Sequence, residues 1–224
     1  MQNNGAKRML IFRRIAMIFS IFIAVSHVAM ASNLGESIAT KGNGKGASAC
    51  STCHGVNGSG LASAGFPRLA GLNAAYIEKQ LRDFTNAKRS SPVMAPMAKA
   101  LSAKDIKAVA DYYSRMKLNT PETNSSNNKT LLLKGKKLAE HGNWPNDIPA
   151  CFTCHGAGAT GIGTHFPALA GQHASYIEQQ LKSWQSGQRD NDPNQLMKGV
   201  AKRLSVTEIK AVSAYLSSLA TAAQ

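Results

Sequence analysis

The pentapeptide Cys50-Ser-Thr-Cys-His54 returns about one hundred positions later as Cys151-Phe-Thr-Cys-His155, and the two copies use all four cysteines of the 224-residue chain. Two thiols three positions apart can each add to a vinyl group of haem, while the adjacent histidine binds the iron. The pattern therefore predicts two covalently bound haem c groups. It assigns their attachment to Cys50, Cys53, Cys151 and Cys154, and one axial ligand of each iron to His54 and His155.

Other uses of a Cys-x-x-Cys pair explain less of the pattern. A thioredoxin-like redox pair belongs in a strand-helix context, and a structural zinc site would draw both pairs into one tetrahedral shell. A disulfide between cysteines three positions apart constrains little chain. None of these alternatives accounts for a histidine directly after each pair, so haem attachment is the favoured interpretation.

A second repeated segment extends well beyond the motif. Residues 66–81 return as residues 166–181 with 11 of 16 positions identical. A period near one hundred residues is too long for a solenoid and fits two tandem domains. We expect a first domain over residues 32–117, a polar, proline-containing linker over 118–128 and a second domain over 129–224. Each domain is small for an independent core, which the haem would complete.

The N-terminus has the pattern of a secretory signal peptide over residues 1–31. Basic residues precede an almost wholly apolar stretch from Ile15 to Ala29, and Ala29-Met-Ala31 fits a small-x-small cleavage site. An uncleaved membrane anchor is the alternative, since the apolar stretch approaches the length that spans a bilayer. Ser26 and His27 interrupt it, which favours cleavage and export to the periplasm.

Apolar periodicity predicts an all-α fold with three main helices in each repeat. One helix precedes the motif. A middle helix is expected from about Ala74 to Lys88, and again from Ala174 to Gly187. The last helix opens at a capping-box pattern, Ser102-Ala-Lys-Asp105 in the first repeat and Ser205-Val-Thr-Glu208 in the second. No segment has a convincing strand pattern.

The duplication also selects the second axial ligand of each iron. When the capping boxes are aligned, Met94 coincides with Met197, whereas Met97 coincides with Val200. We therefore predict Met94 and Met197 as ligands and interpret Met97 as a packing residue. Coordination by histidine and methionine raises the reduction potential. It also leaves no open position on either iron. Adaptable core packing is the usual role of methionine, and we assign it to Met116.

An axial histidine usually donates its other ring N–H to an acceptor that holds its orientation. The repeated Phe-Pro turn offers a carbonyl for this purpose, that of Pro67 for His54 and that of Pro167 for His155. The alternative is that each proline only shapes the turn before the middle helix. Three further histidines lack a counterpart in the other repeat and are expected at the surface or in local hydrogen bonds: His141, His165 and His173.

The chain is basic, with 26 Lys and Arg against 12 Asp and Glu and a formal net charge of +14. The excess is larger in the first half, which contains a dense cluster formed by Arg68, Lys79, Arg82, Lys88 and Arg89. A basic protein outside the cytoplasm rarely meets nucleic acid. Acidic docking faces of redox partners, or anionic lipid surfaces, are therefore the expected partners.

Together, these features resemble the two-haem, two-domain periplasmic cytochromes c of the c4 type. They are the Cys-x-x-Cys-His-Gly segments at residues 50–55 and 151–156, the Phe-Pro-x-Leu-Ala-Gly blocks and the aligned methionines. The resemblance implies two cytochrome-c-like domains related by a pseudo-twofold axis, with their haem propionate edges close together. It also implies an electron shuttle from a quinol-oxidising cytochrome bc complex towards a terminal haem-copper oxidase, often with loose membrane association. The basic cluster departs from the family pattern, so the orientation in which other family members dock is not carried over to this chain.

We therefore predict a non-enzymatic, periplasmic dihaem electron carrier. Two alternatives use the same cofactor. A dihaem peroxidase would need an open or displaceable sixth position on one iron, and the two aligned methionines argue against it. A haem subunit of a membrane-bound dehydrogenase would differ only in its stable association with other subunits.

Overall fold

The computed structural model describes residues 33–117 and 128–221. The predicted signal peptide lies outside these ranges, as does the predicted linker apart from Asn128. Within them the chain forms α-helices and short 3-10 turns, and pairing between extended segments is limited to isolated bridges. The all-α prediction is confirmed. None of the described helices is long and apolar enough to cross a bilayer.

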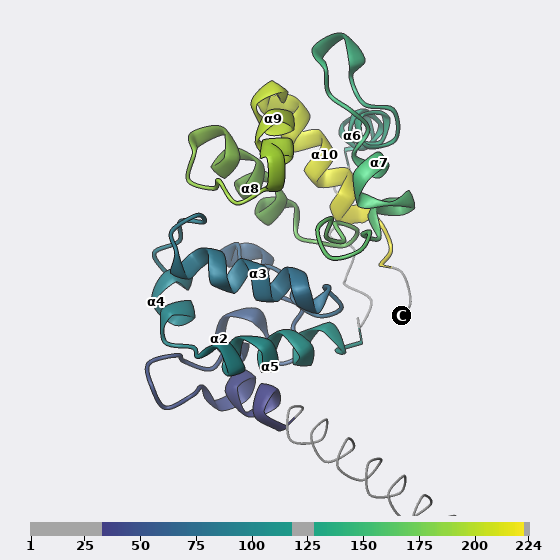
Figure 1. The fold of residues 1–224 in the computed structure, drawn as a ribbon. Helices are drawn as coiled ribbons and strands as arrows, with labels where there is room; N and C mark the ends of the chain where they lie inside the picture. The colour runs from purple at the N-terminus through teal and green to yellow at the C-terminus, as the bar shows by residue number, and fades with distance from the viewer. Residues whose placement is uncertain (1–32, 118–127, 222–224) are drawn as a thin grey trace, which may run out of the picture.

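The helices follow the same order in both halves of the chain (Figure 1). The first half contains a helix over residues 33–41, α2 (Ser51–His54), the 3-10 turn η1 (Ala62–Ala64), α3 (Ala74–Thr85), α4 (Met94–Lys99) and α5 (Ala103–Ser114). The second half contains α6 (Lys129–His141), η2 (Trp144–Asn146), α7 (Cys151–His155), η3 (Ala157–Ala159), α8 (Ala174–Ser186), η4 (Pro193–Gln195), α9 (Leu196–Arg203) and α10 (Val206–Ser218). Figure 1 shows two bundles, with α3 and α8 near their boundary.

In each half, the first helix crosses the last helix at a glycine. A Cβ atom on Gly35 would lie 2.2 Å from the carbonyl oxygen of Ala108, and one on Gly135 would lie 2.1 Å from the carbonyl oxygen of Ala211. No side chain fits at these distances, so only glycine lets the two helix backbones approach this closely. The crossing packs the helix before each motif against the helix that ends each repeat.

The middle helices are present as predicted but end slightly earlier. α3 ends at Thr85 rather than at about Lys88, because Ala87 has a positive φ of 62°. A positive φ cannot continue a right-handed helix. α8 ends at Ser186, and the following Gly187 takes the equivalent left-handed conformation.

Both predicted capping boxes are present. The Ser102 hydroxyl accepts a hydrogen bond from the N–H of Asp105 at 3.1 Å, and the Asp105 carboxylate accepts one from the N–H of Ser102 at 3.0 Å. Ser205 and Glu208 make the same two bonds at 3.2 and 2.9 Å. These reciprocal bonds satisfy amide groups that would otherwise lack partners at the starts of α5 and α10.

Each half has its own apolar core. Apolar side chains of the middle and last helices are buried in these cores: Ile77, Leu81, Phe84, Ile106 and Val109 in the first half, and Ile177, Leu181, Trp184, Ile209 and Val212 in the second. The prediction of three main helices per repeat was incomplete. The motif itself forms α2 and α7, and the aligned methionines lie on two further short helices, α4 and α9.

Candidate haem sites

The Cys-x-x-Cys-His motif forms a helical turn that ends abruptly at a glycine. Gly156 follows α7 with φ 83° and ψ 161°, and Gly55 follows α2 with φ 76° and ψ 151°. This combination of angles is essentially restricted to glycine. The helical turn places the two cysteines of each motif on one side, since residues three apart share a helix face. The glycine then turns the chain away directly after the histidine.

Both motif histidines are buried and are held at the same ring nitrogen. Nδ1 of His54 lies 2.9 Å from the carbonyl oxygen of Pro67, and Nδ1 of His155 lies 2.8 Å from that of Pro167. When Nδ1–H donates to the carbonyl, Nε2 keeps its lone pair. Nε2 of His155 is buried and has no hydrogen-bond partner within the described ranges. Burial lowers the pKa of both imidazoles, which favours the neutral form that can bind a metal.

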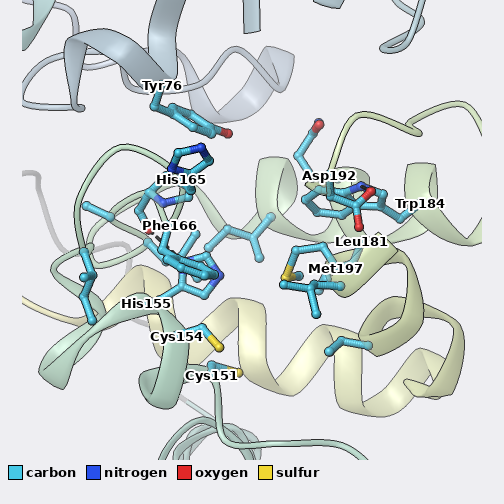
Figure 2. A pocket seen from close by; sticks show the side chains of 18 of the residues that line it. Tyr76, Cys151, Cys154, His155, His165, Phe166, Leu181, Trp184, Asp192 and Met197 are labelled. Atoms are coloured by element: carbon cyan, nitrogen blue, oxygen red, sulfur yellow. Dashed lines mark hydrogen bonds between the residues drawn. The ribbon is translucent and has the colours of Figure 1, made fainter. Parts of the chain in front are cut away.

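A cavity of about 590 Å³ with a mainly apolar lining lies beside the second motif. Figure 2 shows His155 and Met197 on opposite sides of this cavity, with Cys151 and Cys154 below them. A cavity of this size and polarity is suited to a flat apolar macrocycle. The unpartnered nitrogen of His155 offers an iron ligand, and the two sulfurs, which are thiols here and thioethers after attachment, offer the covalent links. The residues present therefore fit a haem c group.

The aligned methionines lie on the short helices α4 and α9. Met94 packs against the apolar core of the first half, and Met197 packs against that of the second. The start of α4 is held by Ser91, whose hydroxyl accepts a hydrogen bond from the N–H of Met94 at 3.0 Å. Met97 lies one turn further along α4 and is half-buried.

Asp192 is a residue of the second site that the sequence analysis missed. One carboxylate oxygen accepts a hydrogen bond from the indole N–H of Trp184 at 3.1 Å, and the other accepts one from the N–H of Lys198 at 2.9 Å. Asp192 thereby ties α8 to the helix that carries Met197. The repeat provides no signal for Asp192, because the segment before the methionine differs in length between the repeats. Met197 follows Arg189 by eight positions, whereas Met94 follows the equivalent Arg89 by five.

The two halves meet beside this cavity in a reciprocal backbone contact. The N–H of Ser90 donates to the carbonyl oxygen of Gln188, and the N–H of Asp190 donates to the carbonyl oxygen of Lys88, both at 2.8 Å. Because these residues occupy equivalent positions in the two repeats, the contact has approximate twofold symmetry. Tyr76 of the first half also borders the cavity (Figure 2).

Arg89 and Arg189 lie at the centre of this contact, and both are buried. Each guanidinium crosses to the other half and donates hydrogen bonds to a glutamine and a tyrosine. The acceptors are Gln180 Oε1 and Tyr176 Oη for Arg89, at 2.7 and 2.6 Å, and Gln80 Oε1 and Tyr76 Oη for Arg189, at 3.0 and 3.3 Å. These acceptors are neutral, and buried cations call for anionic compensation, part of which the buried carboxylate of Asp83 provides for Arg89. The carboxylates of a haem would add to it.

Arg68 forms a second link between the halves and is 2% exposed. Its backbone N–H donates to Gln172 Oε1 at 2.9 Å, and Gln172 Nε2 donates back to the carbonyl oxygen of Arg68 at 3.0 Å. The Arg68 guanidinium also donates to the carbonyl oxygen of Ala170 at 3.0 Å. Burial lowers the pKa of Arg68 to about 10.

The basic cluster predicted in the first half therefore does not form a continuous exposed patch. Arg68 and Arg89 are buried between the halves. Lys79 and Arg82 pair with carboxylates of their own helix. Lys88 is the member of the cluster that is exposed and that no ion pair in the described part of the chain neutralises. The first half thus presents less positive charge to a partner than its composition indicates.

The three remaining histidines differ in their surroundings. His141 is exposed. His165 is exposed at the cavity rim, with Nδ1 2.8 Å from the hydroxyl of Thr164 (Figure 2). His173 is half-buried, and its Nε2 lies 2.9 Å from the carbonyl oxygen of Ser59 in the other half. His173 is thus part of the contact between the two halves.

Comparison with known proteins matches each half of the chain to a family of haem proteins. The family model described as cytochrome c matches residues 132–220, and the model described as cytochrome c oxidase, cbb3-type, subunit III matches residues 38–112. Among curated proteins, the thiosulfate dehydrogenase electron acceptor of Stutzerimonas stutzeri strain A1501 is 43% identical over 187 residues, which cover 83% of this chain and 86% of that protein.

Two solved structures share the fold. Thiosulfate dehydrogenase (TsdBA) from Marichromatium purpuratum is 40% identical with a TM-score of 0.78, and the match covers 84% of this chain and 40% of the larger one. Reduced recombinant cytochrome c4 from Pseudomonas stutzeri is 32% identical with a TM-score of 0.73, and the match covers 84% of this chain and 98% of that chain.

Fold, motifs and matches define a protein with two tandem class I cytochrome c domains. The chain belongs to the dihaem cytochrome c4 family. It is accordingly a dihaem electron-transfer protein that carries two covalently bound haem c groups. The resemblance noted from the sequence and the predicted cofactor are both confirmed.

Proposed function

We propose that this protein is a periplasmic one-electron carrier in which His54 and Met94 hold one iron and His155 and Met197 hold the other. The observation that carries the proposal is the placement of His155 and Met197 on opposite sides of an apolar cavity whose floor contains both cysteines of the motif (Figure 2). Met94 is the residue of the first repeat that aligns with Met197 when the capping boxes are superposed, and it packs against the core of its own half.

Bound haem supplies reversible exchange between ferric and ferrous iron. The four cysteines hold the two macrocycles, and the carbonyl oxygens of Pro67 and Pro167 hold the histidine Nδ1–H groups in a fixed orientation. A methionine sulfur as the second ligand would favour the ferrous state, and the apolar lining would keep water away from the iron. Two protein ligands per iron would leave no position for peroxide, which supports a carrier rather than a peroxidase.

We assign residues 32–117 and 129–224 as the two domains, joined by a linker over residues 118–128. Two observations support this division. Each half has its own core, and the side chain of Asn128 caps α6 by accepting a hydrogen bond from the N–H of Leu131 at 3.0 Å. Residues 1–31 would act as a cleaved signal peptide. The mature protein would then work in the periplasm, with loose association to anionic membrane surfaces.

The proposed electron donor is a thiosulfate dehydrogenase. A relative that is 43% identical is named as the electron acceptor of such an enzyme, and this chain shares its fold with part of thiosulfate dehydrogenase (TsdBA). A terminal haem-copper oxidase is the proposed acceptor. The alternative donor, a quinol-oxidising cytochrome bc complex, follows from the likeness to cytochrome c4.

The donor can be tested by mixing oxidised holoprotein with a purified thiosulfate dehydrogenase and thiosulfate, and following the haem absorption bands in a stopped-flow instrument. We expect rapid reduction of both haems, and no reduction by thiosulfate without the enzyme. A matched experiment uses a purified cytochrome bc complex and quinol. Reduction by the bc complex alone would overturn the proposed donor. Failure of both donors to reduce a protein with two intact haems would overturn the carrier function.

A further inference from the structure

The backbone is arranged in the same way around the two haem sites, but one lining residue differs between them. The carbonyl oxygen of Tyr113 accepts a hydrogen bond from the N–H of Gly71 at 3.0 Å, and the carbonyl oxygen of Leu216 accepts the same bond from Gly171 at 3.0 Å. Tyr113 and Leu216 therefore occupy equivalent positions on α5 and α10. Leu216 lines the cavity of the second site together with Cys151. Tyr113 accordingly stands at the corresponding wall of the first site.

Tyr113 brings a hydroxyl group into a core that is otherwise apolar. The residue is 2% exposed, and Cys50 packs against the same core cluster. The hydroxyl is buried and makes no contact of full hydrogen-bond geometry among the residues that the structure describes, but the thiol of Cys50 lies close enough to interact with it. Burial first, and then the neighbouring Cys50, raise the pKa of Tyr113. The phenol therefore keeps its proton throughout the neutral pH range.

A buried hydroxyl without a full hydrogen bond is unfavourable. Leucine at the equivalent position of the second half avoids this penalty. The first site thus retains a polar group that contacts within the polypeptide do not explain. In the holoprotein a partner is available, because the sulfur of Cys50 becomes a haem thioether, which is a weak hydrogen-bond acceptor.

We propose that Tyr113 is a redox-tuning residue of the first haem, whose hydroxyl donates a hydrogen bond to the thioether sulfur at Cys50 and raises the reduction potential of that haem. This inference rests on the proposed function, because it requires haem at the first motif. The positive end of the O–H dipole lies in a surrounding of low dielectric constant, where it stabilises the state that carries the additional electron. The second haem has no such group, so Tyr113 acts on the difference between the two potentials.

The decisive variant is Tyr113→Phe, which removes only the hydroxyl. Both potentials are measured on the purified holoprotein by spectroelectrochemical titration, and thermal unfolding is recorded in parallel. We expect one potential to fall and the other to stay unchanged. The potential that falls should be the same one that changes in Met94→Ala, because that variant identifies the potential of the first haem. The melting temperature should fall only slightly, because the variant removes one weak hydrogen bond and leaves the ring in the core.

The control is Tyr112→Phe. Tyr112 is the adjacent residue, its ring lies 5.2 Å from that of Tyr113, and it is half-buried, so its hydroxyl is not confined to the core. This variant should leave both potentials unchanged. Unchanged potentials in Tyr113→Phe with both haems intact would overturn the tuning role, as would a fall in stability without a change in potential. Neither result would affect the carrier function, whereas a wild-type protein whose haems cannot be reduced and reoxidised reversibly would overturn that function itself.

Discussion

A histidine can bind iron only while its imidazole is neutral, and burial favours that state for both motif histidines. Burial lowers the pKa of His54 and His155, while the contact of each Nδ1 with a proline carbonyl acts in the opposite direction and is the smaller effect. Each ring therefore stays neutral to a lower pH than a free histidine. The same carbonyl fixes the ring so that Nε2 faces the site. Neutrality and orientation thus come from two different features of one residue's surroundings.

At the same scale, the choice of Met94 over Met97 can be tested by a pair of substitutions. Met94→Ala should remove the far-red absorption band of methionine-ligated ferric haem at one of the two haems, lower its potential and allow cyanide or carbon monoxide to bind. Met97→Ala should change none of these properties. Visible spectra and redox titration of the two holoproteins provide the measurement. Normal spectra in the first variant, or an open iron in the second, would contradict the assignment.

Among the helices, those with a long apolar stripe or a cap could be predicted from the sequence, and the shortest could not. α3 and α8 have 12 and 13 residues, and α5 and α10 begin with capping boxes. α4 has six residues, an N-cap residue, Val93, whose side chain makes no capping hydrogen bond, and an internal proline, Pro96. A helix this short depends on packing rather than on its own propensity, so no local pattern predicts it. The methionines that α4 and α9 carry were selected only because the two repeats could be aligned.

The helix crossing at Gly135 leads to a prediction about an element. Gly135→Ala would place a Cβ atom 2.1 Å from the backbone oxygen of Ala211, which cannot move away without shifting α10. We expect a loss of about 1–3 kcal/mol in the free energy of unfolding, because overpacking outweighs the helix propensity gained with alanine. Denaturant unfolding of the holoprotein measures it.

Gly199→Ala on α9 is the matched control for the crossing. A Cβ atom there would meet only the end of the flexible Arg203 side chain, at 3.3 Å. Alanine should therefore be neutral or stabilise the protein by up to about 1 kcal/mol. Equal effects of the two substitutions would show that the close approach at Gly135 does not limit the packing of α6 on α10.

In the whole molecule, the two halves are joined by polar side chains rather than by a shared apolar core. Arg89 and Arg189 recur at equivalent positions of the repeat, so the sequence shows their correspondence but not their contact. Their burial was not, because it depends on the docking of one half against the other, which no local pattern encodes. Read from composition, these residues indicated a basic surface. In the structure they lie between the halves, and Arg189 lines the cavity of the second half, where its positive charge would attract the carboxylates of a haem.

Arg189→Gln should therefore loosen the contact between the halves. The guanidinium of Arg189 is a donor to Gln80 and Tyr76. Gln80 keeps donors in Arg89 and Asn191, so the hydroxyl of Tyr76 is the acceptor that loses its donor, at a cost of about 1–3 kcal/mol. The substitution also removes the repulsion between the Arg189 and Arg89 charges. This gain offsets only part of the loss, because haem carboxylates would already compensate both charges. We expect a larger radius of gyration in X-ray scattering and a separation of one unfolding transition into two. Arg203→Gln, which changes an exposed arginine of the same half, should alter neither measurement. Identical scattering and a single shared transition in Arg189→Gln would show that the arginine pair does not hold the halves together.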